Sequence, residues 1–312
     1  MSVMSLAALV TLATIPPIHA IVWALIRAWR HASGRPRRAT DADAIFVANI
    51  APAAVAVCVA FLVTLPAFVL FEPAGRRDER PGLLMAVSAV VAAGYLLTVI
   101  ARVLSVVRLS RRYTTTWMSD AHALQTPDWG LPAYAIHADY PVVAVAGVLR
   151  PRLLIDRRVL ESCSAEELRA IADHECAHVK NHDNARRLLI AACIGSHGAA
   201  AQQWRYAAEV AADERAAIDP DRAVVLAGAL IKIARLAAIV PPPSIPFAAI
   251  HDGGSLEIRV QRLLSLNPVP VRNNRRRLVL ACVAVLFVML AASDTKILAA
   301  VHELIELLVR AQ

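Results

Sequence analysis

Long apolar runs and short charged loops alternate along the first third of the chain. The runs cover residues 6–26, 45–71 and 82–104, and each is long enough to cross a bilayer as a helix, which takes about 20 residues. A fourth run, 278–293, lies near the C-terminus and is close to the lower length limit. The pattern predicts a mainly α-helical membrane protein with about four transmembrane helices.

The first run could also be read as a secretory signal peptide. A signal peptide carries positive charge before its apolar core, whereas here no basic residue precedes the run and Arg27 and Arg30 follow it. This reversed polarity favours a retained membrane anchor.

Arginines mark one side of the predicted membrane helices. The loop after the first run holds five arginines against two aspartates, and the loop at 72–81 holds three arginines against three acidic residues. Arg102 lies near the end of the third run and three more arginines follow it by residue 112, and four stand just before the fourth run. Because basic residues are enriched on the cytoplasmic side, we expect a multi-pass protein of the cell membrane with a cytoplasmic middle segment and both termini outside.

This topology divides the chain into three parts. Residues 1–112 form a membrane domain with three transmembrane helices, residues 113–272 a cytoplasmic domain, and residues 273–312 the fourth transmembrane helix with a short tail. In the tail, apolar residues recur at helical spacing, which predicts an amphipathic helix: Ile297, Leu298, Val301, Leu304, Ile305 and Leu308.

The middle segment has the pattern of an α+β domain. Short stretches rich in β-branched residues, 133–138, 141–147 and 152–156, predict a small sheet. Ser164 and Glu167 form a capping-box pattern at the start of a predicted helix. The predicted helices cover 165–181, 184–200, 203–218 and 222–239. Their apolar stretches are too short or too charged to be further membrane spans.

The composition supports a membrane protein and limits the classes of partner that it can bind. Apolar residues make up 58% of the 312 positions and charged residues 19%, with a mean hydropathy of +0.52, which is too apolar for an ordinary soluble globule. The net charge of +8 could suggest nucleic acid, but the arginines flank apolar runs and aromatic residues are only 5%. We therefore expect the lipid bilayer as a partner and no direct nucleic-acid binding. Five scattered cysteines indicate reduced thiols.

The sequence HECAHVKNHDN at 174–184 carries the main chemical signal. On a helix, His174 and His178 stand one turn apart on one face, so both rings can reach one zinc ion, and Glu175 lies beside them. This is the HExxH pattern of zinc hydrolases, in which zinc acidifies a bound water and the glutamate moves its proton. We expect one Zn²⁺ per chain and Glu175 as the catalytic base and acid.

The third zinc ligand has to come from elsewhere in the chain. His182 continues the four-residue spacing, but eight residues of helix separate it from His174 by about 12 Å, too far for two ligands of one ion. Position 184, where some zinc peptidases have their third histidine, is Asn184. Glu209 and Asp213 lie at i and i+4 on a predicted helix. Glu209 is the predicted third ligand, and Asp213 is predicted to orient a liganding histidine.

Two further features concern the surroundings of the predicted site. Cys176 lies on another side of the helix, and as a fourth ligand it would close the position that catalysis needs, so we interpret it as a packing residue. The stretch VVAVAG at 142–147 is either an edge strand that could pair with an extended substrate or a core strand of the small sheet. The sequence does not separate these two alternatives.

These motifs carry a family resemblance over roughly residues 133–265. HECAHVKNHDN followed by ExxxD resembles the integral-membrane zinc peptidases of the beta-lactam sensor-transducer (antirepressor) family and of the related HtpX and CAAX prenyl protease group. The segment that leads into this motif, VVAVAGVLRPRLLIDRRVLESCSAEELRAIADHE, is also similar to the corresponding segment of these peptidases. Asp183 falls where such peptidases often have an aspartate. The resemblance implies a zincin-like peptidase domain with a glutamate as third ligand.

The resemblance also implies a function. Three spans before the peptidase domain and one after it are the layout of the sensor-transducer family, although only about 20 residues follow the fourth run, so the outer penicillin-binding sensor domain is lacking. We expect a zinc endopeptidase that cleaves a protein at the cytoplasmic face, with a DNA-binding transcriptional repressor in a signalling pathway as one candidate substrate.

Several alternatives stay open at this point. One is a membrane-protein quality-control protease of the HtpX kind, and another is a non-catalytic signalling scaffold that keeps zinc for structure. The segment 250–266 resembles an HtpX-type stretch in which His251 or Arg259 could reach the site, but Asp252 replaces the usual proline. The substrate, the inducing signal and the oligomeric state, a homo-oligomer included, are not specified by the sequence.

Overall fold

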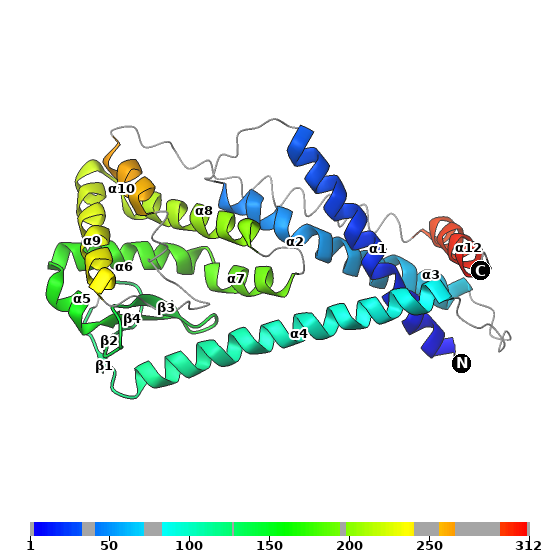
Figure 1. The fold of residues 1–312 in the computed structure, drawn as a ribbon, viewed down its shortest axis with the longest axis horizontal. Coiled ribbons are helices and arrows are strands. Elements are labelled where there is room, and N and C mark those ends of the chain that lie inside the picture. Colours follow the sequence, from blue (N-terminus) through cyan, green and yellow to red (C-terminus); the bar gives the residue numbers. More distant parts are fainter. Residues whose placement is uncertain are drawn as a thin grey trace.

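The computed structural model of the chain is mostly helical and elongated, with a small sheet at one end (Figure 1). It describes residues 3–32, 41–71, 83–126, 128–193, 198–239, 256–265 and 294–310. The first helices of the chain lie at one end of the long axis, the sheet lies with helices at the other end, and one long helix runs between them.

Three helical segments are long and apolar enough to cross a membrane: Ser5–Trp29, Ala42–Phe71 and Met85–Met118. The first belongs to α1 (Val3–Ala32) and the third to α4 (Leu83–Met118). The second is continuous through α2 (Ala42–Val59), a π-helical turn (η1, Ala60–Thr64) and α3 (Leu65–Phe71). The three predicted spans in the first third of the chain are therefore present as helices. The fourth predicted span, 278–293, lies outside the described residues.

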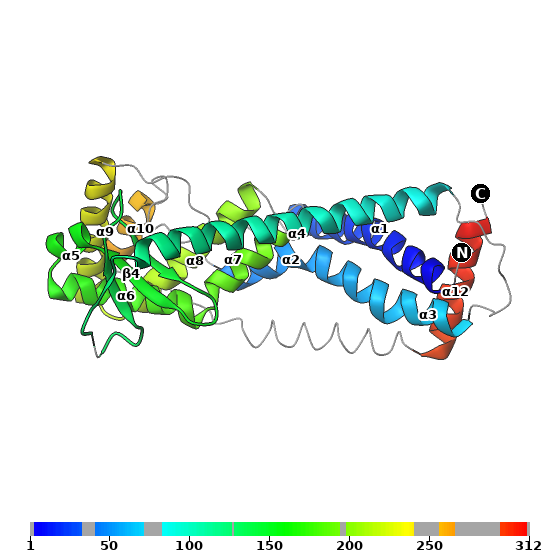
Figure 2. The same cartoon turned by 90° about the horizontal axis from the view of Figure 1, so that it is seen from below.

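Small residues allow the three segments to pack closely. Ala56 and Ala60 are fully buried against Ile15 of α1, and the Ser88 hydroxyl of α4 donates a hydrogen bond to the Ala13 carbonyl at 2.6 Å. The predicted amphipathic tail is a helix, α12 (Thr295–Arg310), and its Leu298 packs onto α3 and the π-helical turn. Figure 2 shows α12 across the far ends of these helices.

Helix α4 continues well beyond the apolar run that predicts it. The prediction ended at residue 104 because arginines begin there, but the helix runs on to Met118 without interruption. Its last turn carries Trp117, which is buried against the sheet. Polar residues such as arginine are good helix formers, so the change in hydropathy marks the end of the apolar stretch and not the end of the helix.

The sheet has four strands in the order β1-β2-β4-β3. They are β1 (His122–Ala123), β2 (Ala133–Ile136), β3 (Val143–Ala146) and β4 (Arg152–Asp156). Strand β4 runs parallel to β2 and antiparallel to β3. Three strands lie where the sequence predicts them, and β1 was missed because two residues carry no alternation. Among the described residues β3 is a terminal strand of the sheet, and its four side chains are all buried, so it has features of both alternatives for 142–147.

Six helices follow the sheet or pack beside it: α5 (Arg157–Ser162), α6 (Ala165–Lys180), α7 (Asp183–Ala192), α8 (Ala199–Ala216), α9 (Pro220–Ile239) and α10 (Leu256–Leu264). The capping box of Ser164 and Glu167 at the start of α6 is confirmed. The predicted helix 184–200 is wrong at its end, because α7 stops at Ala192. Gly198 has a φ of +64°, which a continuous right-handed helix does not allow. Helices α5 and α10 were not predicted.

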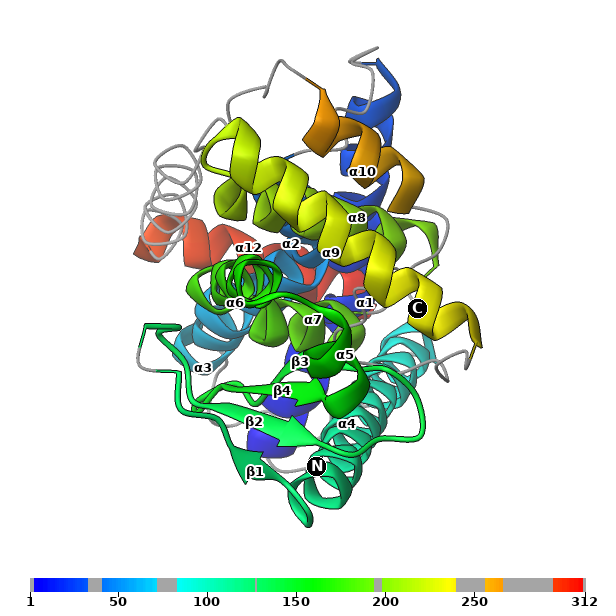
Figure 3. The same ribbon diagram turned by 90° about the vertical axis from the view of Figure 1, so that its left-hand side faces the viewer.

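The sheet lies between two apolar cores. On one face, Val143, Val145, Leu153 and Ile155 pack against α6 and α9. On the other face, Ile136, Ala144 and Leu154 pack against Trp117 at the end of α4. Figure 3 shows the helices stacked on one side of the sheet, with α6 over β3 and β4. Helix α6, which carries the HExxH residues, is thereby held rigidly at the end strand of the sheet.

Candidate metal centre

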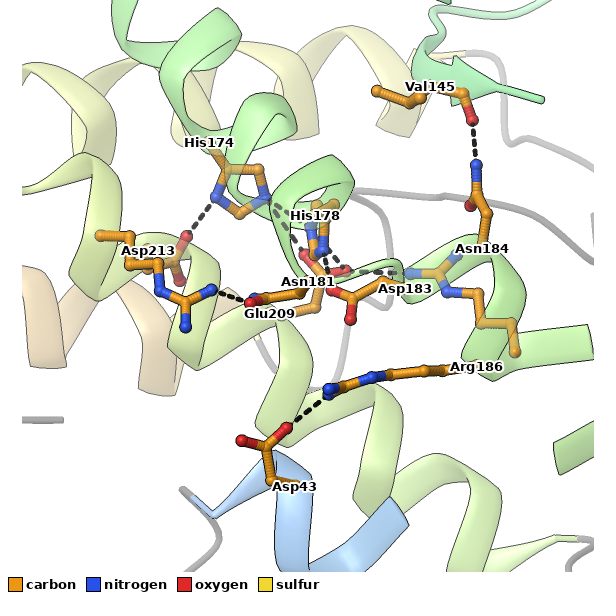
Figure 4. A network of polar contacts seen from close by, with 12 residues as sticks. Asp43, Val145, His174, His178, Asn181, Asp183, Asn184, Arg186, Glu209 and Asp213 are labelled. Carbon is orange, nitrogen blue, oxygen red and sulfur yellow. Dashed lines mark hydrogen bonds and ion pairs between the residues drawn. The ribbon is translucent and has the colours of Figure 1, made fainter. Parts of the chain in front are cut away.

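Two helices bring the three predicted metal ligands together. His174 and His178 lie one turn apart on the buried face of α6, and their Nε2 atoms are 3.1 Å from each other. Glu209 of α8 approaches both, with a carboxylate oxygen 3.5 Å from each Nε2 atom. The ligand atoms of the three residues all lie within 4.8 Å of one another. This group could hold a metal ion (Figure 4).

The outer nitrogens of the two histidines contact carboxylates. Nδ1 of His174 lies 3.0 Å from Oδ1 of Asp213, and Nδ1 of His178 lies 2.7 Å from Oδ2 of Asp183. Because a carboxylate accepts a hydrogen bond, Nδ1 of His178 carries the ring proton and its Nε2 presents a lone pair. The contact of His174 with Asp213 lacks hydrogen-bond geometry, but the adjacent carboxylate favours a proton on that Nδ1 as well. The two Nε2 lone pairs and the Glu209 carboxylate face one another, and these groups repel unless a cation lies between them. The geometry therefore fits a metal ion, or protons in its place.

The ionisation of the group follows from its burial and charges. Burial lowers the pKa of a histidine, but Glu209 and Asp183 outweigh it and raise the pKa of His178 to about 10. The pKa of His174 is also raised, because Asp213 and Glu209 outweigh burial in the same way. Burial alone would raise the pKa of Glu209, yet His178 and Arg259 hold it well below its usual value. The site thus favours positive charge between these side chains.

Glu175 lies next to this group and is almost completely buried, with 1% of its surface exposed. Burial raises the pKa of its carboxyl group, and within the described part of the chain its Oε2 atom has no hydrogen-bond partner. A buried carboxylate oxygen without a partner is costly, which indicates that a water molecule or another ligand group belongs beside it. The structure places Glu175 where the sequence predicts the catalytic residue.

Two arginines balance part of the negative charge. Arg259 of α10 donates two hydrogen bonds of 2.7 Å to the carboxylate of Asp213 and lies 3.1 Å from Glu209. Arg187 of α7 donates to Glu209 at 3.3 Å. Counting Glu175, Asp183, Glu209 and Asp213 against these two cations leaves two negative charges when the histidines are neutral. A divalent metal ion would neutralise the site.

Other candidates from the sequence lie outside the group. His182 is exposed and adopts a left-handed conformation with a φ of 56° between α6 and α7, so it does not reach the metal ligands. The thiol of Cys176 faces away from the histidines and donates to the Trp129 carbonyl at 2.9 Å, in agreement with a packing role. His251 lies outside the described residues, whereas Arg259 is 1% exposed and part of the group.

No role for Arg187 was predicted from the sequence, and that of Arg259 was left undecided. A signal for Arg259 was present, because it shares a helical stripe with Leu256, Val260 and Leu263 where an apolar residue is expected. A charged residue in such a stripe indicates a buried partner. Arg187 gives no comparable signal. It is adjacent to Arg186, and a single sequence does not show which of the two arginines is directed toward the site.

The sequence was compared with protein-family models and with curated proteins. No family model matches the chain, and no curated protein matches it. The candidate metal centre therefore rests on the geometry of its own residues: two buried imidazoles and a carboxylate around a common point, beside a buried glutamate with an unpartnered oxygen.

Proposed function

We propose that this protein is a zinc-dependent endopeptidase anchored in the cell membrane, with its α+β domain on the cytoplasmic side. The convergence of His174, His178 and Glu209 beside Glu175 is the observation that carries the proposal. The three candidate membrane helices support the anchoring, and the arginine distribution supports the cytoplasmic side.

Zinc is the proposed metal because the donors are two imidazole nitrogens and one carboxylate. This set leaves the fourth tetrahedral position open, as in hydrolytic zinc enzymes. When bound, zinc would supply a Lewis acid that makes water a nucleophile near neutral pH. Asp183 and Asp213 would fix the rings of His178 and His174 in the orientation that presents Nε2.

Glu175 would move the proton. Its burial raises the pKa of its carboxyl group toward the range in which a carboxylate both accepts and returns a proton near neutral pH. Oε2 of Glu175, which lacks a hydrogen-bond partner among the described residues, is the atom that would accept the proton from the attacking water. The same oxygen would then donate it to the leaving amine of the cleaved peptide bond.

The terminal strand β3 is the proposed docking site for the scissile segment. The Asp156 amide donates to the Val142 carbonyl at 2.8 Å, and bonding alternates along an antiparallel pair. The register of β3 and β4 therefore directs the backbone N–H and C=O groups of Val142, Ala144 and Ala146 toward β4. The backbone groups of Val143 and Val145 point away from β4, to the open side of β3. An extended peptide could add to the sheet at these groups.

A protein at the inner membrane face is the proposed substrate, and a transcriptional repressor is one candidate. A quality-control protease would use the same residues with several unfolded membrane proteins as substrates. A scaffold with structural zinc fits the site less well, because structural sites have four protein ligands. Among the described residues only three donors converge, and the nearby Asp183 and Asp213 are occupied by Nδ1 atoms.

Replacement of Glu175 by glutamine tests the proposal. The full-length protein in lipid nanodiscs should cleave a protein substrate in the wild type, and Glu175→Gln should retain its zinc but lose cleavage by at least about 100-fold. Glu214→Gln is the matched control, because Glu214 lies on α8 and pairs with Arg262 outside the metal group. Cleavage by Glu175→Gln at the wild-type rate would contradict the proposed mechanism.

A further inference from the structure

Helix α7 (Asp183–Ala192) joins the candidate metal centre to a membrane helix. Four of its first five residues bind other parts of the molecule: Asp183, Asn184, Arg186 and Arg187. Three of them face the metal centre and the sheet, and one faces α2. Figure 4 shows these contacts around the one helix.

On the side of the metal centre, α7 holds three components of the site. Asp183 contacts His178 at 2.7 Å, and Arg187 contacts Glu209 at 3.3 Å. The side-chain amide of Asn184 donates to the carbonyls of Val145 and Gly147, both at 2.9 Å. The Val145 carbonyl belongs to the outward-facing groups of β3, so Asn184 occupies a position that an added peptide strand would use.

On the side of the membrane helices, α7 is tied to the first turn of α2. Arg186 forms an ion pair with Asp43 at 2.6 Å, and its guanidinium lies over the ring of Phe46 at 5.1 Å. Further along α7, Ile190 is buried in a cluster with Ile45 of α2 and Trp204 of α8. Because both the ion pair and the apolar cluster include α2, a displacement of α2 would act on α7 directly.

In this arrangement the site is closed. His174 and Glu175 are at most 1% exposed, and the residues of β3 are at most 3% exposed. The metal ligands are buried, and Asn184 holds the outward carbonyl of Val145, so a peptide that pairs with β3 at this carbonyl has to displace Asn184. Among the described elements, α7 is the one that contacts the outward face of β3, the histidine pair through Asp183, and a membrane helix.

We propose that α7 is an autoinhibitory latch: it covers the substrate edge of β3 through Asn184, and the ion pair of Arg186 with Asp43 makes its release depend on the position of α2. The substrate side of this proposal rests on the endopeptidase function proposed above. The latch is one helix of ten residues. It tilts about its first residue, Asp183, which stays bound to His178, so a shift at Arg186 also moves Asn184 and Arg187. Release of α7 frees the Val145 carbonyl and opens a path to Glu175.

Hydrogen exchange in the full-length protein tests the latch. Arg186→Ala and Asp43→Ala each remove the ion pair, and we expect the backbone amides of 142–147 to exchange about tenfold faster, equivalent to about 1.4 kcal/mol of closing free energy. The amides of β4 serve as an internal reference for global unfolding. Arg222→Ala is the control, because it removes an ion pair with Asp173, at 3.1 Å, that does not involve α7.

A charge reversal makes the test specific to the pair. The double variant with Asp43→Arg and Arg186→Asp should restore slow exchange at 142–147, because the attraction is regained with the partners exchanged. Unchanged exchange in both single variants, or equal acceleration in β3 and β4, would overturn the latch. Exchange is independent of catalysis: faster exchange at β3 without any peptide cleavage would uphold the latch and contradict the endopeptidase function.

Discussion

At the scale of single residues, the two imidazoles of α6 determine what the site can bind. Their Nδ1 atoms lie beside Asp213 and Asp183, and their Nε2 atoms meet at 3.1 Å beside Glu209. In the absence of metal, the raised pKa values of both histidines mean that protons take the place of the cation. Metal and protons therefore compete for the same lone pairs.

This competition predicts a pH-dependent metal affinity. Zinc binds neutral imidazole, and His178 has a pKa of about 10 without metal, so zinc binding at pH 7 should release at least one proton. The apparent affinity should rise about tenfold per pH unit for each proton released, up to the pKa of His178. Calorimetry in two buffers of different ionisation enthalpy measures the proton count. No proton release at pH 7 would contradict the assigned tautomers and charges.

Arg259 is expected to support the site through Asp213. Removal of one partner of a buried ion pair leaves an uncompensated charge and typically costs about 3–5 kcal/mol, and loss of a group that orients a ligand weakens metal binding about 10- to 100-fold. Arg259→Ala should therefore lower both the melting temperature and the zinc affinity. Arg262→Ala, on the same helix with a partly exposed partner in Glu214, should change neither by a comparable amount.

The ligand residues could be predicted from the sequence, and much of their environment could not. His174, His178 and Glu209 follow from helical spacing and from the geometry that excludes His182. Asp213 also follows, because four residues on a helix place it beside Glu209. Arg187 and Asn184 could not be predicted, since their partners on α8 and β3 are brought to them by tertiary packing and leave no local pattern.

At the scale of elements, α6 depends on its N-terminus. The Ser164 hydroxyl accepts a hydrogen bond from the Glu167 amide at 3.2 Å, and the Glu167 carboxylate accepts one from the Ser164 amide at 2.7 Å. Ser164→Ala should lower the free energy of unfolding of the domain by about 1 kcal/mol, measured as a shift in thermal unfolding. Ser162→Ala, at an exposed position at the end of α5, should have a negligible effect.

Long periodic segments were predicted well and short ones poorly. Helices α6, α8 and α9 lie close to their predicted bounds because each has an apolar stripe over several turns. The two-residue strand β1 and the six-residue helix α5 are formed by their neighbours in the fold. Helix α7 ends early because Cys193, directly after Ala192, adopts an extended conformation, which the sequence pattern does not indicate.

At the scale of the whole molecule, α4 connects the membrane part to the sheet as one uninterrupted helix. It crosses the region of the other membrane helices, packs beside α1, and ends with Trp117 in the core below the sheet. The candidate metal centre is thus connected to the candidate membrane helices by α4 and by the contact of α7 and α8 with α2. Hydropathy predicted the three spans but not this rigid connection.

The proposed topology predicts which sites a membrane-impermeant thiol reagent reaches. A cysteine at Ser119, which is exposed at the end of α4, should react only after cells are permeabilised. A cysteine at Ala74, in the loop between the second and third predicted spans, should react in intact cells. The wild-type protein controls for its own cysteines. Labelling of Ser119→Cys in intact cells would contradict a cytoplasmic metal centre.

The most direct test of the central claim is X-ray absorption at the zinc edge of the purified full-length protein. We predict one zinc ion per chain with two imidazole nitrogens and oxygen ligands, at distances of about 2.0–2.2 Å. The signal should be lost in His178→Ala and in Glu209→Ala, and retained in Glu175→Gln. A protein without stoichiometric metal, a sulfur shell at about 2.3 Å, or a wild-type spectrum in Glu209→Ala would contradict the proposed zinc site.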